Sequence, residues 1–166
     1  MNAVTTRLAL PKDAADIARM LALLAQDLGD GDVFSTTQAT IQQHGFGPEP
    51  MFHTLIAEIA GQSVGLALFF RHFSTTRAQP GAYVQDLWVA KDARGNTVGQ
   101  DLLAAVARYG GAHWGAAYIS LAVHAGNARA AQFYQRLGFE VHANDRPLTL
   151  KGPAFQDFLN KGADTQ

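Results

Sequence analysis

The residues best suited to chemistry lie in a polar turn, Arg94 to Gly99, between an apolar strand-like segment and an amphipathic helix-like one. A helix start exposes backbone N–H groups that have no intrahelical partner and carries the positive end of the helix dipole. Gly95 and Gly99 would let an anion approach those groups, and Arg94 adds a permanent positive charge. These residues alone fit an anion site and an ordinary helix start with a surface arginine equally well.

Several classes of site are excluded or disfavoured by what the chain lacks. No Gly-Lys-Ser or Gly-Lys-Thr closes the turn, and no Gly-x-Gly-x-x-Gly is present, which argues against a P-loop or a dinucleotide fold. The absence of cysteine excludes disulfides, thiolate metal sites and a cysteine nucleophile. The net charge of −1 and the short apolar runs predict neither nucleic-acid nor membrane partners. We therefore expect a cytoplasmic protein without a resident metal.

The elements that must position this turn follow from the hydrophobic periodicity of the 166 residues, which suit a single domain over 1–166. Alternation predicts strands at 4–9, 54–60, 64–73, 82–89 and 117–123, with final strands at 139–142 and 148–151. Helical spacing and capping residues predict helices at 13–28, from a Ser35 capping box to 45, at 98–111, at 127–138 and a last turn at 155–159. The expected class is α/β, a mixed and mostly antiparallel sheet flanked by helices, in the order β-α-α-β-β-β-α-β-α-β.

A second group of residues lies on the helix that begins after Asn127. Asn127 is a natural N-cap, and Gly138 is a natural stop. Tyr134 shares the inner face of that helix with other apolar side chains, so spacing alone favours a core aromatic over a catalytic one. Nothing in its own spacing assigns chemistry to this helix.

Taken together, the two blocks resemble a known superfamily. Arg94-Gly95-x-x-x-Gly99, followed by Leu102-Leu103, is similar to the acetyl-CoA-binding motif of GNAT N-acetyltransferases. The block 127–139 resembles the later helix of that superfamily and follows at the expected distance. The segments 45–58 and 64–70 further resemble the diamine (spermidine/spermine and thialysine) acetyltransferase subfamily. The resemblance covers nearly the whole chain and implies a twisted sheet that opens around the cofactor, commonly in a homodimer.

The resemblance implies direct attack of a small primary amine on the acetyl carbonyl of acetyl-CoA. It assigns Tyr134 as the acid that protonates the departing thiolate, and a backbone N–H near Leu87 as the group that polarises the carbonyl. It assigns contacts with acetyl-CoA to Leu87, Trp88, Val89, Arg94, Gly95, Asn96, Thr97, Val98, Gly99, Gln100, Asn127 and Tyr134. It assigns the substrate side to Asp27, Gln85 and Asp86.

Two positions depart from the family pattern. Thr97 stands where a glycine is usual, and a β-branched residue resists positive φ. Gln85 stands where the diamine enzymes have a glutamate that acts as general base. Deprotonation by Asp86, by His124 or by a water held by Gln85 all remain open, as does a less basic amine. The alternative function is an acyl-CoA-binding module that has lost transfer activity.

Overall fold

The computed structural model describes residues 3–142 and 147–161, which divide into two compact units after residue 127. The first unit contains the strands β1 (Val4–Leu8), β2 (His53–Ile59), β3 (Gln62–Ser74), β4 (Gln79–Val89) and β5 (Ile119–Leu121). Its helices are α1 (Ala14–Leu28), α2 (Gln38–Gly45) and α3 (Val98–Trp114), with short 3-10 turns η1 (Pro11–Asp13), η2 (Gly31–Val33) and η3 (Lys91–Ala93). The second unit contains α4 (Ala128–Arg136) and α5 (Pro153–Asn160). That the two units form one domain stays a prediction.

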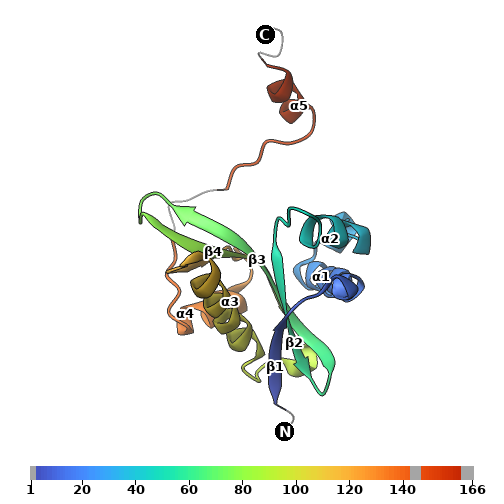
Figure 1. Ribbon diagram of the computed structural model, residues 1–166, viewed down its shortest axis with the longest axis vertical. Coiled ribbons are helices and arrows are strands. Elements are labelled where there is room, and N and C mark those ends of the chain that lie inside the picture. Colours follow the sequence, from blue (N-terminus) through green and yellow to red (C-terminus); the bar gives the residue numbers. More distant parts are fainter. Residues whose placement is uncertain (1–2, 143–146, 162–166) are drawn as a thin grey trace. The chain divides into compact units, whose positions relative to one another are not determined.

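The five strands form one mixed sheet in the order β1-β2-β3-β4-β5 (Figure 1). The first four pair antiparallel, and β4 pairs with β5 in parallel. The β2–β3 hairpin turns through Ala60 and Gly61, whose φ values of 51° and 76° are those of the tight turn that hairpins favour. The expected α/β class with a mixed, mostly antiparallel sheet is confirmed.

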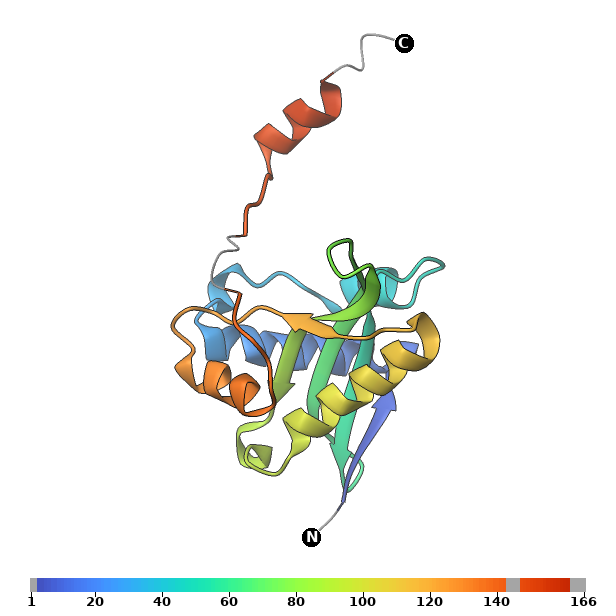
Figure 2. The same ribbon diagram turned by 90° about the vertical axis from the view of Figure 1, so that its left-hand side faces the viewer.

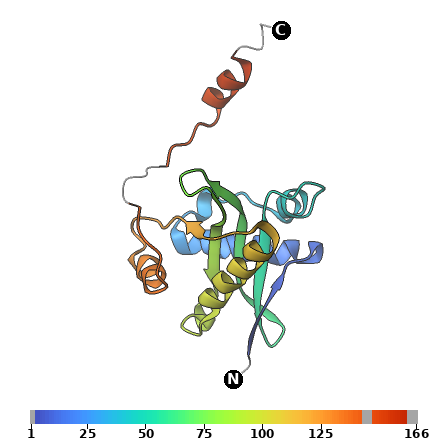
Figure 3. The same ribbon diagram turned by 60° about the vertical axis from the view of Figure 1, so that its left-hand side comes forward.

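The helices of the first unit cover both faces of the sheet. In Figures 2 and 3, α1 and α3 lie on opposite sides of the strands. The α1 face buries Ile17 and Met20 against Ile56, Leu66 and Trp88. On the other face α3 turns a buried stripe toward the sheet: Val98, Leu102, Leu103, Ala105 and Val106. Two apolar layers therefore hold β3 and β4 at the centre of the unit.

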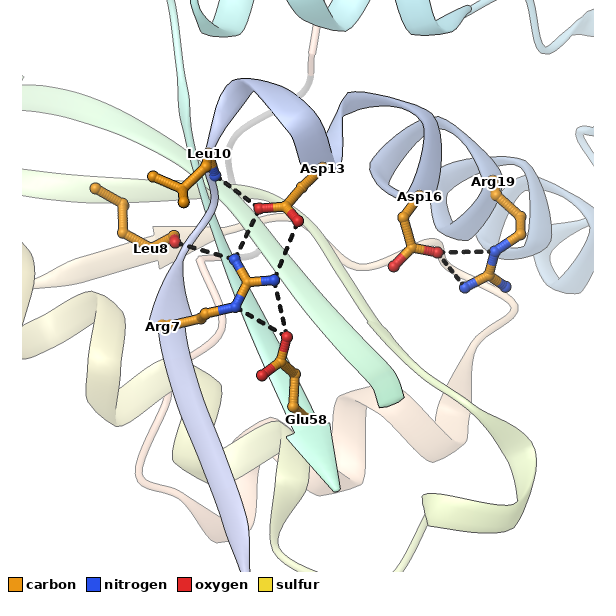
Figure 4. A network of polar contacts seen from close by, with 7 residues as sticks. All are labelled: Arg7, Leu8, Leu10, Asp13, Asp16, Arg19 and Glu58. Atoms are coloured by element: carbon orange, nitrogen blue, oxygen red, sulfur yellow. Dashed lines mark hydrogen bonds and ion pairs between the residues drawn. The ribbon is translucent and has the colours of Figure 1, made fainter. Parts of the chain in front are cut away.

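Arg7 ties β1 to the start of α1 and to β2 (Figure 4). Its guanidinium donates to the Asp13 carboxylate at 2.7 and 3.1 Å and to the Glu58 carboxylate at 2.9 Å. Asp13 also accepts the Leu10 N–H at 2.7 Å. The hydrogen bonds from Arg7 lower the pKa of Asp13. This network anchors the helix that covers one face of the sheet.

Two helix boundaries differ from the sequence-based expectation. The helix α2 begins after Thr37 rather than Ser35, because the Thr37 hydroxyl accepts the Thr40 N–H at 3.2 Å. The helix α3 continues through its glycines to Trp114, because that ring packs against Phe69, 5.8 Å between centroids. Tertiary packing here outweighs the low helix propensity of glycine.

The predicted strands at 139–142 and 148–151 are absent from the described residues, which carry no strand in the second unit. Alternation alone does not make a strand, since a strand also needs a neighbour for its backbone groups. The β5 strand, predicted over 117–123, is confirmed over three residues only. The last predicted helical turn is confirmed by α5.

Candidate active site

A β-bulge interrupts β4 in the middle of its pairing with β3. Asp86 pairs with Leu68 and Val84 pairs with the next residue, Phe69, so that Gln85 has no partner. A bulge of this kind bends the strand and changes the direction in which the following residues point. On its other side β4 pairs with β5 only from Ala82 to Val84. Beyond the bulge, β4 therefore presents an edge that β5 does not cover.

The bulge also decides which backbone groups face that edge. Before the bulge, the Ala82 N–H donates toward the β5 side at 3.0 Å, and after it the Ala90 N–H donates back to β3 at 2.8 Å. Because N–H groups alternate in direction along a strand, the N–H groups of Leu87 and Val89 point to the uncovered edge. In a strand without the bulge, the backbone N–H groups of Asp86 and Trp88 would point to the uncovered edge instead. The uncovered edge thus offers backbone donors to a bound chain.

The turn between β4 and α3 carries the second set of donors. In the described part of the chain, none of the six backbone N–H groups from Gly95 to Gln100 has a hydrogen-bond acceptor. Gly95 has φ 89°, and a Cβ built there would meet nothing within 4 Å. Six consecutive free donors at the positive end of a 17-residue helix are suited to bind an anion.

Thr97 adopts the backbone conformation that we expected a β-branched residue to resist. Its φ of 55° and ψ of −8° lie in the left-handed region, so the turn keeps the path that a glycine would take. Its hydroxyl donates to the Asp101 carboxylate at 2.8 Å, and its carbonyl accepts the Asp101 N–H at 2.9 Å. We expect these two bonds to offset the strain of that conformation. The spacing of Thr97 and Asp101, one helical turn apart, was the signal in the sequence that we missed.

Arg94 and Asp27, assigned above to different ligands, lie in direct contact. The Arg94 guanidinium donates to the Asp27 carboxylate at 2.5 Å and to the Val89 carbonyl at 2.8 Å. Trp88 Nε1–H donates to the same carboxylate at 3.3 Å, and the Lys91 ammonium lies 3.7 Å from it. Burial opposes ionisation of Asp27, but the Arg94 hydrogen bond and charge lower its pKa overall. The structure thus gives Asp27 three partners at the turn.

Trp88, at 7% exposure, packs in the α1-side core with Leu66. Asp86 lies two residues before Trp88 on β4, after the bulge, and so faces the same side of the sheet. Burial raises the pKa of Asp86 to about 6. Gln85, the bulged residue, is exposed. The two substrate-side candidates on β4 therefore lie in different surroundings.

Asn127 and Tyr134 both belong to the block 127–139. Asn127 ends the first unit, and its N–H donates to the His124 carbonyl at 2.8 Å. Tyr134 lies on α4 with its ring against Phe133 and Phe139, at centroid distances of 5.1 and 5.4 Å. Burial raises the pKa of Tyr134 to about 12, so the hydroxyl keeps its proton at neutral pH. That these two side chains meet the β4 edge stays a prediction.

Gly65 is a further residue that positions the turn and that the sequence pattern did not single out. A Cβ at Gly65 would lie 2.9 Å from the Trp88 carbonyl oxygen and 3.3 Å from the Val98 side chain. Only a glycine lets the start of α3 approach the sheet this closely. Its position inside a predicted strand was the available signal.

Two further properties of the described residues bear on the chemistry. They contain no group of three or more His, Asp or Glu side chains that could hold a metal ion. None of their helices is both long enough and apolar enough to cross a membrane.

Comparison with known proteins places these features in context. The model of the acetyltransferase (GNAT) family matches residues 18–139. Thialysine N-epsilon-acetyltransferase from Sus scrofa is 30% identical over 146 residues, covering 83% of this chain and 85% of that protein. L-ornithine N5-acetyltransferase from Arabidopsis thaliana is 32% identical over 98 residues, covering 58% of this chain and 42% of that protein. An integron cassette protein from Vibrio cholerae shares the fold with a TM-score of 0.78 at 18% identity, covering 94% and 97% of the two chains.

Proposed function

The chain belongs to the GNAT acetyltransferase family, and on that premise we propose that it transfers the acetyl group of acetyl-CoA to a primary amine of a small molecule. The named acetyltransferase relatives favour an enzyme over the alternative of a non-catalytic binding module. The observation that carries the proposal is the run of six backbone N–H groups, from Gly95 to Gln100, without acceptors.

The residues present fit acetyl-CoA in two places. The free N–H groups of the turn suit a pyrophosphate, which needs several convergent donors. The edge of β4 beyond Val84, which β5 does not cover, suits the amide-containing arm of the cofactor. The amides of that arm would hydrogen-bond to the β4 backbone as a neighbouring strand does. Arg94 holds positive charge beside the turn while Asp27 and the Val89 carbonyl orient it. When bound, acetyl-CoA supplies the acetyl thioester.

The protein's own groups then have defined tasks in a direct transfer. The Leu87 N–H, pointing to the uncovered edge, donates to the thioester carbonyl oxygen, where negative charge develops as the amine attacks. The Tyr134 hydroxyl, protonated at neutral pH because burial raises its pKa to about 12, donates its proton to the departing sulfur. Asn127 and the amides of the turn hold the nucleotide end.

The acceptor proposed here is a small basic amine, either a polyamine, a diamine or an amino-acid-like compound. The names of the relatives point in this direction, because thialysine and L-ornithine both carry a side-chain primary amine. Gln85 and Asp86, around the bulge, lie nearest along the strand to the proposed thioester position and would face the acceptor. Asp27 is assigned to orienting Arg94, since its carboxylate already accepts two hydrogen bonds.

The proposal is tested first by binding and then by turnover. Acetyl-CoA should raise the melting temperature of the protein. At a ligand concentration one hundred times Kd, the free energy of unfolding should increase by about 2.7 kcal/mol. A screen of ornithine, thialysine, spermidine and short diamines should give acetyl-dependent release of free thiol with at least one of them. No thermal shift at saturating acetyl-CoA would overturn the cofactor assignment.

Tyr134→Phe tests the acid. We expect turnover to fall about 100-fold or more with acetyl-CoA binding retained, because the ring stays and only the proton donor is lost. Phe133→Tyr, which adds a hydroxyl on the neighbouring position, is the matched control and should not restore turnover in the double variant. Unchanged turnover in Tyr134→Phe would remove Tyr134 from the mechanism.

We further propose a homodimer in the cytoplasm, as the family resemblance implies. Analytical ultracentrifugation of the purified chain should give twice the 17.8 kDa chain mass. A single species at the chain mass across the micromolar range would overturn the homodimer.

A further inference from the structure

We propose that the Asp86 carboxylate is the general base of the reaction and takes the proton from the acceptor ammonium in place of the glutamate that Gln85 replaces. The inference rests on the proposed transfer to a primary amine and assigns the one role which that proposal leaves without a residue. It is carried by the β4 bulge, by the side of the sheet that Asp86 faces, and by the lack of a partner for its carboxylate.

The bulge places Asp86 at the point where the strand edge becomes available. Residues up to Val84 are paired with β5, and Leu87, the first edge residue whose N–H points outward, directly follows Asp86. A base must reach the amine while the amine attacks a carbonyl held at that N–H. Asp86 directly precedes the donor residue along the strand. Gln85 is equally close, but its amide cannot accept a proton at neutral pH.

The surroundings of Asp86 keep its carboxylate free for this task. Asp86 pairs with Leu68, and both lie on the sheet face that carries the apolar core against α1. Among the described residues no side chain donates a hydrogen bond to Asp86 and no cation forms an ion pair with it. A half-buried carboxylate without a partner is costly to maintain unless a ligand completes it. An incoming ammonium group is the complement that this site lacks.

The other titratable groups on this face are committed elsewhere. Asp27, facing from α1, is bonded to Arg94 and Trp88. His72 on β3 is paired with the Tyr118 hydroxyl, 2.6 Å from its Nδ1. Tyr83 on β4 stacks on Phe70 at a centroid distance of 5.2 Å. Of the two carboxylates assigned above to the substrate side, Asp27 is engaged by Arg94 and Trp88, whereas Asp86 is not engaged by any described side chain.

Burial gives Asp86 the basicity that a general base requires. Its pKa, raised to about 6, leaves the group ionised at neutral pH, yet it makes the carboxylate a much better proton acceptor than an ordinary aspartate. In the complete step, the ammonium N–H bond breaks and Asp86 takes that proton. The amine lone pair forms the C–N bond, the C–S bond breaks, and Tyr134 protonates the sulfur. The acetylated nitrogen then loses its second proton, which returns through water to the Tyr134 oxygen, and Asp86 releases its proton to solvent, so that the net products are the amide, the free thiol and one proton.

The experiment is a pH–rate profile of the full chain and of Asp86→Asn from pH 5 to 10, with the best acceptor from the amine screen. The wild type should lose kcat as the pH falls through about 6, because Asp86 becomes protonated. In Asp86→Asn, kcat at pH 7 should fall about 100-fold or more. Its rate should then rise about tenfold per pH unit toward the amine pKa near 10.4, because only the free amine reacts.

A second acceptor and a matched variant distinguish the loss of a general base from general damage to the site. An alkoxyamine is already neutral at pH 7, so Asp86→Asn should acetylate it within about threefold of the wild type. Asp92→Asn makes the same chemical change on the exposed turn η3 and should leave both profiles unchanged. Gln85→Glu in the Asp86→Asn background should restore part of kcat for the basic amine.

The outcomes distinguish this inference from the function on which it rests. Wild-type protein that acetylates no amine overturns the proposed function, and the assignment of Asp86 with it. If the wild type acetylates an amine and Asp86→Asn keeps both kcat and its decrease at low pH, Asp86 is not the base, but the proposed function stands. An increase in KM for the basic amine at unchanged kcat also overturns it, since Asp86 would then bind the ammonium without accepting its proton.

Discussion

The carboxylate of Asp27, at the end of α1, holds the guanidinium of Arg94 at 2.5 Å. Arg94 is the only arginine in the turn that precedes α3, and its second bond goes to the Val89 carbonyl at 2.8 Å. Residues 67 positions apart therefore fix the direction of the charge that we assign to the pyrophosphate site. The first helix contributes to that site without supplying a ligand group.

The Arg94–Asp27 pair should contribute measurably to stability. In a double-mutant cycle with alanine at both positions, we expect a coupling of about 1 kcal/mol in the free energy of unfolding, since both side chains are about one-third exposed or less. The pair Arg19 and Asp16 is the control, because its side chains are 53% and 34% exposed. That pair should couple by less than about 0.5 kcal/mol. If urea unfolding gives equal coupling energies for the two pairs, the burial of the Arg94–Asp27 pair does not strengthen it.

Thr97 and Asp101 should be coupled in the same manner. Thr97→Gly should change the free energy of unfolding by less than about 0.5 kcal/mol, because relief of about 1 kcal/mol of left-handed strain offsets the lost hydroxyl bond. Asp101→Ala alone should cost about 1 kcal/mol. In the Thr97→Gly background the same change should cost almost nothing. A full cost in both backgrounds, measured by thermal unfolding, would show that the bond at 2.8 Å does not offset the strain.

Gly65→Ala, on the neighbouring strand β3, should disturb the cofactor site that lies between β4 and α3. The new methyl group would meet the Trp88 carbonyl oxygen at 2.9 Å and side chains of α3, so the start of α3 must shift. We expect a loss of about 1–3 kcal/mol in stability and a weaker acetyl-CoA-induced thermal shift. Gly111→Ala, on the same helix with its nearest contact at 3.9 Å, is the control. Equal acetyl-CoA affinities in the two variants would rule out Gly65 as a positioning residue.

Acid should weaken the network around Arg7. Because the Arg7 hydrogen bonds lower the pKa of Asp13 in the folded chain, the pair stabilises the fold above the unfolded pKa of about 3.9. That contribution, about 1 kcal/mol, is lost as the pH falls through the lower folded pKa. Asp13→Asn and Arg7→Met should each flatten the dependence of unfolding free energy on pH between about 2 and 5. Identical slopes in wild type and both variants would refute this origin.

Local patterns in the sequence account for most elements of the first unit. Alternation located β1 to β4 within a few residues, and the polar Arg94–Gly99 turn was identified from its glycines and its charge. The pairing of that turn with the 127–139 block indicated the family, which the match of the family model to residues 18–139 confirms. These features depend on residues close together in the chain, where spacing carries the information.

Longer-range features were not accessible in this way. The α3 helix runs through its glycines because the Trp114 ring packs on Phe69, and the strands predicted after 138 are absent because no neighbour pairs with them in the described residues. The bulge at Gln85 depends on the register between β3 and β4, which no local pattern specifies.

The sequence by itself determined the family, the α/β class and the position of the polar turn that we assign to acetyl-CoA, because each rests on residue types at short, regular spacing. Only the tertiary structure decided what Asp27 contacts and which side of the sheet Asp86 faces. Asp27 meets Arg94 across 67 residues, and Asp86 faces the α1-side core because a bulge shifts the strand by one residue. Burial and partners, which set the charge state of a carboxylate, come into being only when distant segments pack together.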